Sequence, residues 1–183
     1  MIKEYENILN KKEKDFFKKE IISNINFPFY LNFKSVKSVE GSKDNYFPFF
    51  THKILQRPED VKTGESRINS TYYNSFVTLF NDLSKRCKFK YKELLRICIN
   101  FTFNSGEEKC PLHVDHPYPH KQLLIYIHNE DLNSFTFIYD KKEKKLIKKI
   151  KPTVNKGVIW NSLPHYHLTP KKGYRVVVIY TFK

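Results

Sequence analysis

The stretch HVDHPYPH, residues 113–120, places three histidines and one aspartate within eight positions of a chain that contains seven histidines. His113 and Asp115 are two residues apart, so extended backbone would point their side chains to the same side. An imidazole and a carboxylate held side by side are suitable ligands for a divalent transition metal. The HxD pattern also occurs by chance in solvated loops. A third ligand from elsewhere in the chain would therefore be needed to support a metal site.

A third ligand is available near residue 165, in the segment GVIWNSLPHYHLTPKKGYR. His165 follows the HxD pattern by about 50 residues and precedes Arg175 by ten. His167, eight residues before Arg175, is the alternative ligand. We favour His165 because it directly follows Pro164, whose fixed φ restrains the backbone there.

Two imidazoles and one carboxylate indicate which metal chemistry is available. Such ligands occupy one face of an octahedron and leave three positions open, which non-haem Fe(II) needs to bind a bidentate cosubstrate and O2. Zinc is chemically possible with the same ligands. Arg175 favours iron, because a guanidinium on the inner face of the last strand suits a dicarboxylate cosubstrate and has no role in a zinc hydrolase.

The second half of the chain consists of segments with strand patterns. In 96–104, RICINFTFN, the residues Ile97, Ile99, Phe101 and Phe103 alternate with more polar ones, so one face is core and the other is polar. Five further strands are expected at 121–129, 134–140, 144–151, 156–162 and 174–183. Their connections are too short for crossover helices, so the sheets should be antiparallel and form a sandwich or barrel.

Helices and edge strands are expected in the first half. Apolar residues at helical spacing predict a first, broken helix over 2–22 and a second that starts at Ser70. The aromatic segments 26–33 and 45–55 contain prolines and read as short edge strands around the polar loop 38–45. We expect a single domain, 1–183, in which 1–95 supports a β core formed by 96–183 and the helices cover one sheet.

Length and composition are those of one soluble domain. The chain has 183 residues, of which 40% are hydrophobic and 16% aromatic, enough for a single packed core. No stretch reaches the roughly 20 apolar residues of a membrane span, and the charged N-terminus lacks the apolar region of a signal peptide. Three cysteines without metal-knuckle spacing indicate reduced thiols. We therefore expect a cytoplasmic protein that does not associate with membranes.

The formal net charge of +14 raises the question of nucleic-acid binding. The lysines, however, are scattered from one end of the chain to the other, which favours a solvated lysine surface. Nucleic-acid binding stays an alternative with weak support. A positive field would in any case favour an acidic small ligand or an acidic partner.

The segments that carry the candidate ligands resemble the Fe(II)- and 2-oxoglutarate-dependent oxygenases, whose core is a double-stranded β-helix, a cupin-like jelly roll. HVD at 113–115 is similar to the HxD motif of that family, and PHYHLTPKKGYR at 164–175 is similar to its distal histidine segment. Upstream, NFPFYL, YFPFFTHKI, NSTYYNSFVTLFNDL and LLRICINFTF resemble small phage-encoded, prolyl-hydroxylase-like members. LNSFTF at 132–137 departs from the family, which usually has paired glycines there.

The resemblance implies a mainly β fold with N-terminal helices and an enzyme that hydroxylates a C–H bond, releasing succinate and CO2. Its cofactors would be Fe(II), 2-oxoglutarate and O2, with ascorbate as a candidate stimulant. His113, Asp115 and His165 would bind the metal, and Arg175 would pair with the far carboxylate of 2-oxoglutarate. Further candidates for cosubstrate binding are Tyr126, Thr181 and Asn100.

The substrate is less constrained than the cosubstrate. Likeness to prolyl-hydroxylase-like members suggests a protein residue such as proline. Nucleobase repair is disfavoured, because Thr181 stands where such oxygenases carry a second arginine. The alternatives are an oxygenase acting on a nucleic acid or a small molecule, and a non-redox, cupin-like metal-binding or structural domain. A phage origin would place the protein in the host cytoplasm.

Overall fold

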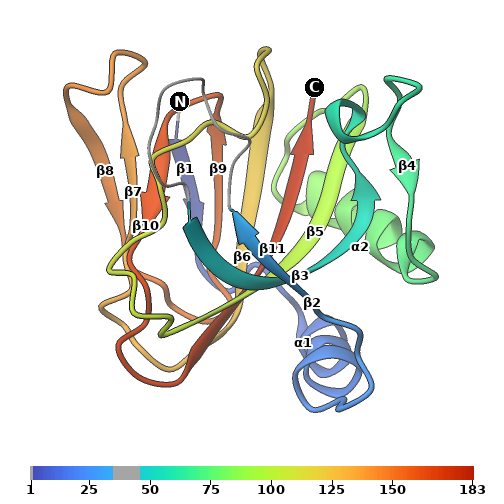
Figure 1. The fold of residues 1–183 in the computed structure, drawn as a ribbon. Coiled ribbons are helices and arrows are strands. Elements are labelled where there is room, and N and C mark those ends of the chain that lie inside the picture. Colours follow the sequence, from blue (N-terminus) through green and yellow to red (C-terminus); the bar gives the residue numbers. More distant parts are fainter. Residues whose placement is uncertain (1, 35–45) are drawn as a thin grey trace.

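The computed structural model describes residues 2–34 and 46–183 and shows two antiparallel sheets that face each other (Figure 1). The larger sheet has the strand order β1-β9-β6-β11-β5-β3-β2, with β4 paired to β3. Its strands are β1 Ile2–Tyr5, β2 Tyr30–Lys34, β3 Tyr46–Gln56, β4 Arg67–Ile68, β5 Leu94–Phe103, β6 Lys121–Asn129, β9 Gly157–Asn161 and β11 Tyr174–Phe182. The smaller sheet, ordered β10-β7-β8, is formed by β7 Thr136–Tyr139, β8 Leu146–Ile150 and β10 His165–His167. The expected antiparallel sandwich is confirmed.

Apolar side chains fill the space between the two sheets. Leu124 of β6 and Val177 of β11 belong to the same buried cluster as Ile138 of β7 and Ile150 of β8. Burial of such residues stabilises the sandwich by about 1.5–3 kcal/mol per side chain. The two sheets are therefore held together by hydrophobic packing rather than by strand pairing.

Strand β5 shows how the alternating sequence is used. Ile97 and Ile99 are fully buried in the cluster on the helix side of the larger sheet. Asn100 and Thr102 lie on the opposite face of the strand and line a cavity between the sheets. The face predicted to be polar is therefore an interior surface, not a solvated one.

The helices cover the outer face of the larger sheet (Figure 1). They are α1 Lys11–Phe17, its π-helical continuation η1 Lys18–Ile22, and α2 Tyr73–Arg86, with a short 3-10 turn, η2, at Pro58–Asp60. Phe76, Phe80 and Leu83 of α2 are fully buried, and the Phe80 ring lies 4.7 Å from that of Tyr180 in β11. The prediction that the helices cover one sheet is confirmed.

The prediction of a broken helix over 2–22 was wrong at its start. Residues 2–5 form β1, which pairs with β9 in a register that sets Ile2 opposite Trp160. The helix begins only after Asn10, whose side chain caps the backbone N–H of Glu13 while the Glu13 carboxylate accepts from the Asn10 backbone. Asn7, at φ 52°, turns the chain between strand and helix.

Two further expectations need correction. Strand β3, expected at an edge, lies between β5 and β2, and the ladder is irregular near Pro48, where a missing N–H is tolerated. The segment 165–167, which lies outside the expected strands, forms β10 and pairs with β7. The polar loop expected at 38–45 lies outside the described residues. No helix in the described part of the chain is long and apolar enough to cross a membrane.

Candidate metal centre

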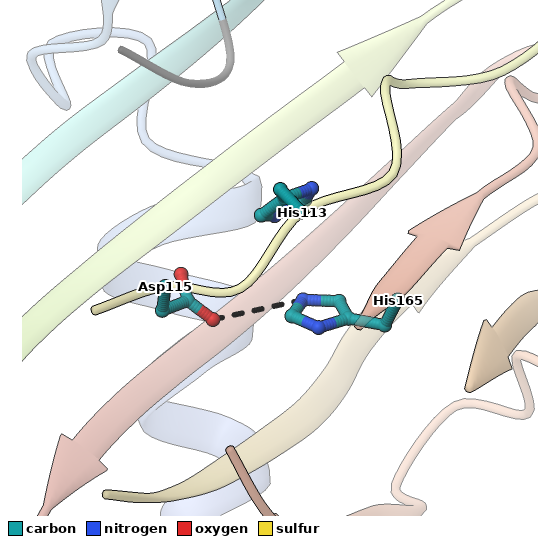
Figure 2. A group of neighbouring side chains, drawn as sticks. All are labelled: His113, Asp115 and His165. Carbon is teal, nitrogen blue, oxygen red and sulfur yellow. Dashed lines mark ion pairs between the residues drawn. The ribbon is translucent and has the colours of Figure 1, made fainter. Parts of the chain in front are cut away.

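A cavity opens between the two sheets, and polar side chains from several strands converge on it. His113, Asp115 and His165 each offer one ligand atom there, and these atoms lie within 4.8 Å of one another. Figure 2 shows the three side chains next to one another, with the carboxylate of Asp115 facing the ring of His165. The cavity is lined by Phe47, Phe49, Arg96, Asn100, Thr102, Cys110, His113, Asp115, Gln122, Leu124, Thr136, His165, His167, Arg175, Val177 and Ile179.

Backbone pairing brings the two histidines together. The N–H of His113 donates to the carbonyl of His165 at 3.0 Å, and the N–H of His165 donates to the carbonyl of His113 at 2.9 Å. This isolated antiparallel bridge joins the loop after β5 to the first residue of β10. The ring centroids are consequently 4.5 Å apart although the residues are distant in sequence.

The imidazole tautomers suit metal binding. Nδ1 of His113 lies 2.8 Å from the carbonyl of Pro111, and Nδ1 of His165 lies 3.0 Å from the carbonyl of Leu163. A carbonyl accepts only, so each Nδ1 carries the proton and each Nε2 keeps its lone pair. Such backbone contacts fix the ring orientation of metal-binding histidines.

Asp115 has one oxygen bound and one free. Oδ1 accepts from Nη1 of Arg96 at 2.8 Å, and Nη1 of Arg57 holds the backbone carbonyl of Asp115 at 2.8 Å. Oδ2 is buried, has no hydrogen-bond partner in the described part of the chain, and lies 3.6 Å from Nε2 of His165 (Figure 2). A buried carboxylate oxygen without a donor fits a cation ligand.

Electrostatics keep the three groups in the protonation states that metal binding requires. Burial raises the pKa of Asp115, but the positive charges facing it, His165 when protonated and Arg96, together hold that pKa well below its usual range. Burial lowers the pKa of His165 to about 4. At neutral pH His165 is therefore uncharged, and Arg96 is the cation that keeps Asp115 ionised.

Arg175 lies in the same cavity and has no carboxylate partner among the described residues. Its side chain is 2% exposed, Nη1 donates to the carbonyl of Ser134 at 3.2 Å, and Nε has no partner among the described residues. Burial lowers its pKa, yet a guanidinium keeps its proton at neutral pH. A buried cation facing a cavity is satisfied by an anionic ligand, and a carboxylate matches its fork of donors.

The structure treats the three additional cosubstrate candidates differently. Asn100 lines the cavity, and its Oδ1 accepts from the hydroxyl of Thr51 at 2.7 Å. Tyr126 is not a lining residue, but its hydroxyl lies 2.8 Å from that of Thr136, which is one. Thr181 does not line the cavity, because its hydroxyl is 2.7 Å from Nε2 of His116.

Three residues that line the cavity had received little or no role in the sequence analysis. Arg96 pairs with Asp115, as described above. Gln122 is 1% exposed and lines the cavity, and neither atom of its amide has a partner in the described part of the chain. Its position as a polar residue in the apolar run KQLLIYI was the available signal. His167 lines the cavity but does not belong to the group of three ligands.

Comparison with known proteins adds the fold relationship. The sequence matches no protein-family model and no curated protein. A 2OG-Fe(II) oxygenase family oxidoreductase from Burkholderia pseudomallei superposes with a TM-score of 0.72, at 10% identity, over 100% of this chain and 84% of that one. The fold is that of the 2OG-Fe(II) oxygenases.

Two other structures with this fold carry hydroxylase names. A prolyl hydroxylase from Trichoplax adhaerens, in complex with a peptide of the hypoxia inducible factor, has a TM-score of 0.62 at 16% identity, covering 99% of this chain and 82% of that one. A viral collagen prolyl hydroxylase from Paramecium Bursaria Chlorella virus-1 has a TM-score of 0.53 at 14% identity, covering 98% and 94%. The expected double-stranded β-helix of the 2OG-Fe(II) oxygenase fold is thus confirmed.

Proposed function

We propose that this protein is an Fe(II)- and 2-oxoglutarate-dependent dioxygenase that hydroxylates a C–H bond and releases succinate and CO2. The observation that carries the proposal is that one cavity contains both a group of metal ligands and a buried cation. Three ligand atoms from His113, Asp115 and His165 converge within 4.8 Å. The buried side chain of Arg175, whose Nε has no partner among the described residues, lines the same cavity. A site for a metal alone would require the three ligands but not Arg175.

The residues fit the implied groups. Nε2 of His113, Nε2 of His165 and Oδ2 of Asp115 would hold Fe(II), and this ligand set would leave room for a 2-oxo acid to bind the metal. Arg175 would bind the far carboxylate of 2-oxoglutarate. When bound, iron and 2-oxoglutarate supply the oxidising chemistry with O2.

The protein's own contribution is positioning and the exclusion of water. Arg96 keeps the Asp115 carboxylate ionised and oriented through the 2.8 Å contact. Phe47, Leu124 and Val177 add apolar surface to the cavity wall, which strengthens ionic contacts inside by lowering the local dielectric constant. Neither role requires these side chains to react.

The substrate we propose is a residue of a protein or peptide, with proline as the first candidate. The support is the peptide complex of the prolyl hydroxylase with the same fold and the presence of further prolyl hydroxylases among the similar structures. A reducing cytoplasm suits this activity, because it preserves Fe(II) and the three cysteines, Cys87, Cys98 and Cys110, which are free thiols.

The test is succinate production from 2-oxoglutarate after anaerobic loading with Fe(II) and addition of O2, with and without proline-containing peptides. We expect iron-dependent succinate in the wild type, loss of activity and of bound iron in His113→Ala, and full activity in the matched control His128→Ala. His128 lies at the end of β6 beside Glu130, away from the cavity lining. Iron and 2-oxoglutarate binding without any turnover would instead favour the non-redox metal-binding domain.

A further inference from the structure

His167 has a position in the cavity that metal binding does not explain. It lies two residues beyond His165 on β10, and both side chains line the cavity. Its ligand atoms are not part of the group formed by His113, Asp115 and His165. Its Nε2 is shielded from solvent and has no hydrogen-bond partner in the described residues.

The other ring nitrogen of His167 is held by a thiol. Nδ1 lies 3.1 Å from Sγ of Cys110, and the same sulfur accepts the backbone N–H of His167 at 3.2 Å. Burial raises the pKa of the Cys110 thiol to about 12, so the sulfur keeps its proton and can donate it to Nδ1. A neutral imidazole that accepts at Nδ1 carries its own proton on Nε2. When the thiol donates in this way, Nε2 is a hydrogen-bond donor on a ring that lines the cavity.

Strand pairing places His167 on the side of the cavity where Arg175 lies. His167 is opposite Thr136 in the β10–β7 ladder, and Thr136 also lines the cavity. Arg175 donates to the carbonyl of Ser134, two residues before Thr136.

We propose that His167, through Nε2–H, binds the carboxylate of 2-oxoglutarate that lies away from the metal, together with Arg175. This inference rests on the proposed function and adds a second donor to it. A carboxylate has room for several donors, and Arg175 alone leaves Nε2 of His167 buried without a partner. A neutral imidazole is suited to this position, because a second cation next to Arg175 would be repelled.

The test measures ligand affinity rather than turnover. Iron-loaded protein is titrated calorimetrically, without oxygen, with 2-oxoglutarate and with 2-oxopentanoate, which has the same chain length but no far carboxylate. In His167→Leu we expect affinity for 2-oxoglutarate to fall about 10- to 100-fold, as for loss of a hydrogen bond to a charged group. Affinity for 2-oxopentanoate and the iron content should equal those of the wild type.

Two more variants separate donor loss from misfolding. The amide of His167→Gln reaches about as far as Nε2, whereas that of His167→Asn reaches only as far as Nδ1. We therefore expect His167→Gln to keep most of the affinity and His167→Asn to lose it. If His167→Leu does not fold, this pair alone decides the outcome, and equal affinities in the two variants overturn the inference.

The failure of this inference differs from that of the proposed function. A wild type that binds 2-oxoglutarate, loses it in Arg175→Leu and keeps it in His167→Leu overturns the role of His167 alone. Loss of iron in His167→Leu also overturns it, because the histidine would then belong to the metal side. A wild type that binds iron but no 2-oxoglutarate overturns the proposed function together with this inference.

Discussion

Arg96 is the residue on which the ionised state of Asp115 depends. Both side chains are largely buried, with 14% and 5% of their surfaces exposed, and their contact measures 2.8 Å. A carboxylate in this environment without a cation would tend to take up a proton, because burial disfavours its charged form. Since a protonated carboxyl is a poor metal ligand, Arg96 supports the metal centre without touching the metal.

Replacing Arg96 with methionine should therefore weaken metal binding about 10- to 100-fold, the usual effect of removing a partner of a metal ligand. Arg96→Lys, which keeps the charge, should retain part of the affinity. Calorimetric titration of the metal-free protein with Fe(II) under nitrogen measures the effect. Arg67→Met is the matched control, because Arg67 is exposed on β4. Unchanged affinity in Arg96→Met would show that Asp115 needs no cation.

At the scale of elements, helix α2 supports the strand that carries Arg175. The Phe80 ring is fully buried and lies 4.7 Å from Tyr180 and 5.1 Å from Phe182, both in β11. Arg175 lies at the other end of that strand, facing the cavity. The helix thus contributes to the site indirectly, by packing against the outer face of the sheet.

Removal of the Phe80 ring should lower the free energy of unfolding substantially. We expect Phe80→Ala to cost about 3–5 kcal/mol, since it leaves a cavity in a packed core. Urea denaturation followed by circular dichroism gives the value. The control is Phe33→Ala, because Phe33 is 54% exposed and its loss should cost little. Similar costs for the two substitutions would contradict the packing assigned to α2.

At the scale of the whole molecule, the metal site exists only in the folded chain. The ligands come from the loop before β6 and from β10, and the described backbone joins them through the bridge between His113 and His165. An unfolded chain would have to close a loop of about 50 residues to recreate the site, at an entropic cost. Metal binding must therefore be linked to the stability of the fold.

Thermal unfolding should show this linkage directly. With Fe(II) at about 100 times its dissociation constant, we expect about 2.7 kcal/mol of stabilisation and a rise in Tm of roughly 5–10 °C for a chain of this size. The shift should disappear in Asp115→Ala and persist in the control His128→Ala. A chelator should reverse it in the wild type. An equal shift in Asp115→Ala would mean that iron binds elsewhere.

The net charge of +14 also belongs to this scale. Lys156 is tied to Glu4 and Glu6 by contacts of 3.3 and 2.9 Å, so part of the basic surface is paired. The net excess of positive charge produces a field that favours the approach of anionic ligands. The single-domain organisation over 1–183 stays a prediction, and nucleic-acid binding stays an alternative with weak support.

Much of the architecture could be predicted because it depends on the pattern of residues within single segments of the sequence. Alternation along 96–104 predicted β5, and the spacing of two residues between His113 and Asp115 predicted side chains on the same side. A polar residue at every second position of β5 was also visible in sequence, but not whether that face met solvent or a cavity. That distinction depends on the second sheet, which covers the face only after folding.

Features that depend on pairing between distant segments were decided by the tertiary structure. Ile2 fits a helical pattern as well as a strand, and its place opposite Trp160 in β9 is what makes residues 2–5 a strand. Thr181 is expected on the same face of β11 as Arg175 from the alternation along the strand. Its hydroxyl nevertheless contacts His116, which lies in a loop, and the alternation within β11 gives no information about that loop. His167 turns toward the cavity because 165–167 pairs with β7, which sets alternate side chains on one face. In each case the partner is far away in the chain, and spacing within one segment carries no information about it.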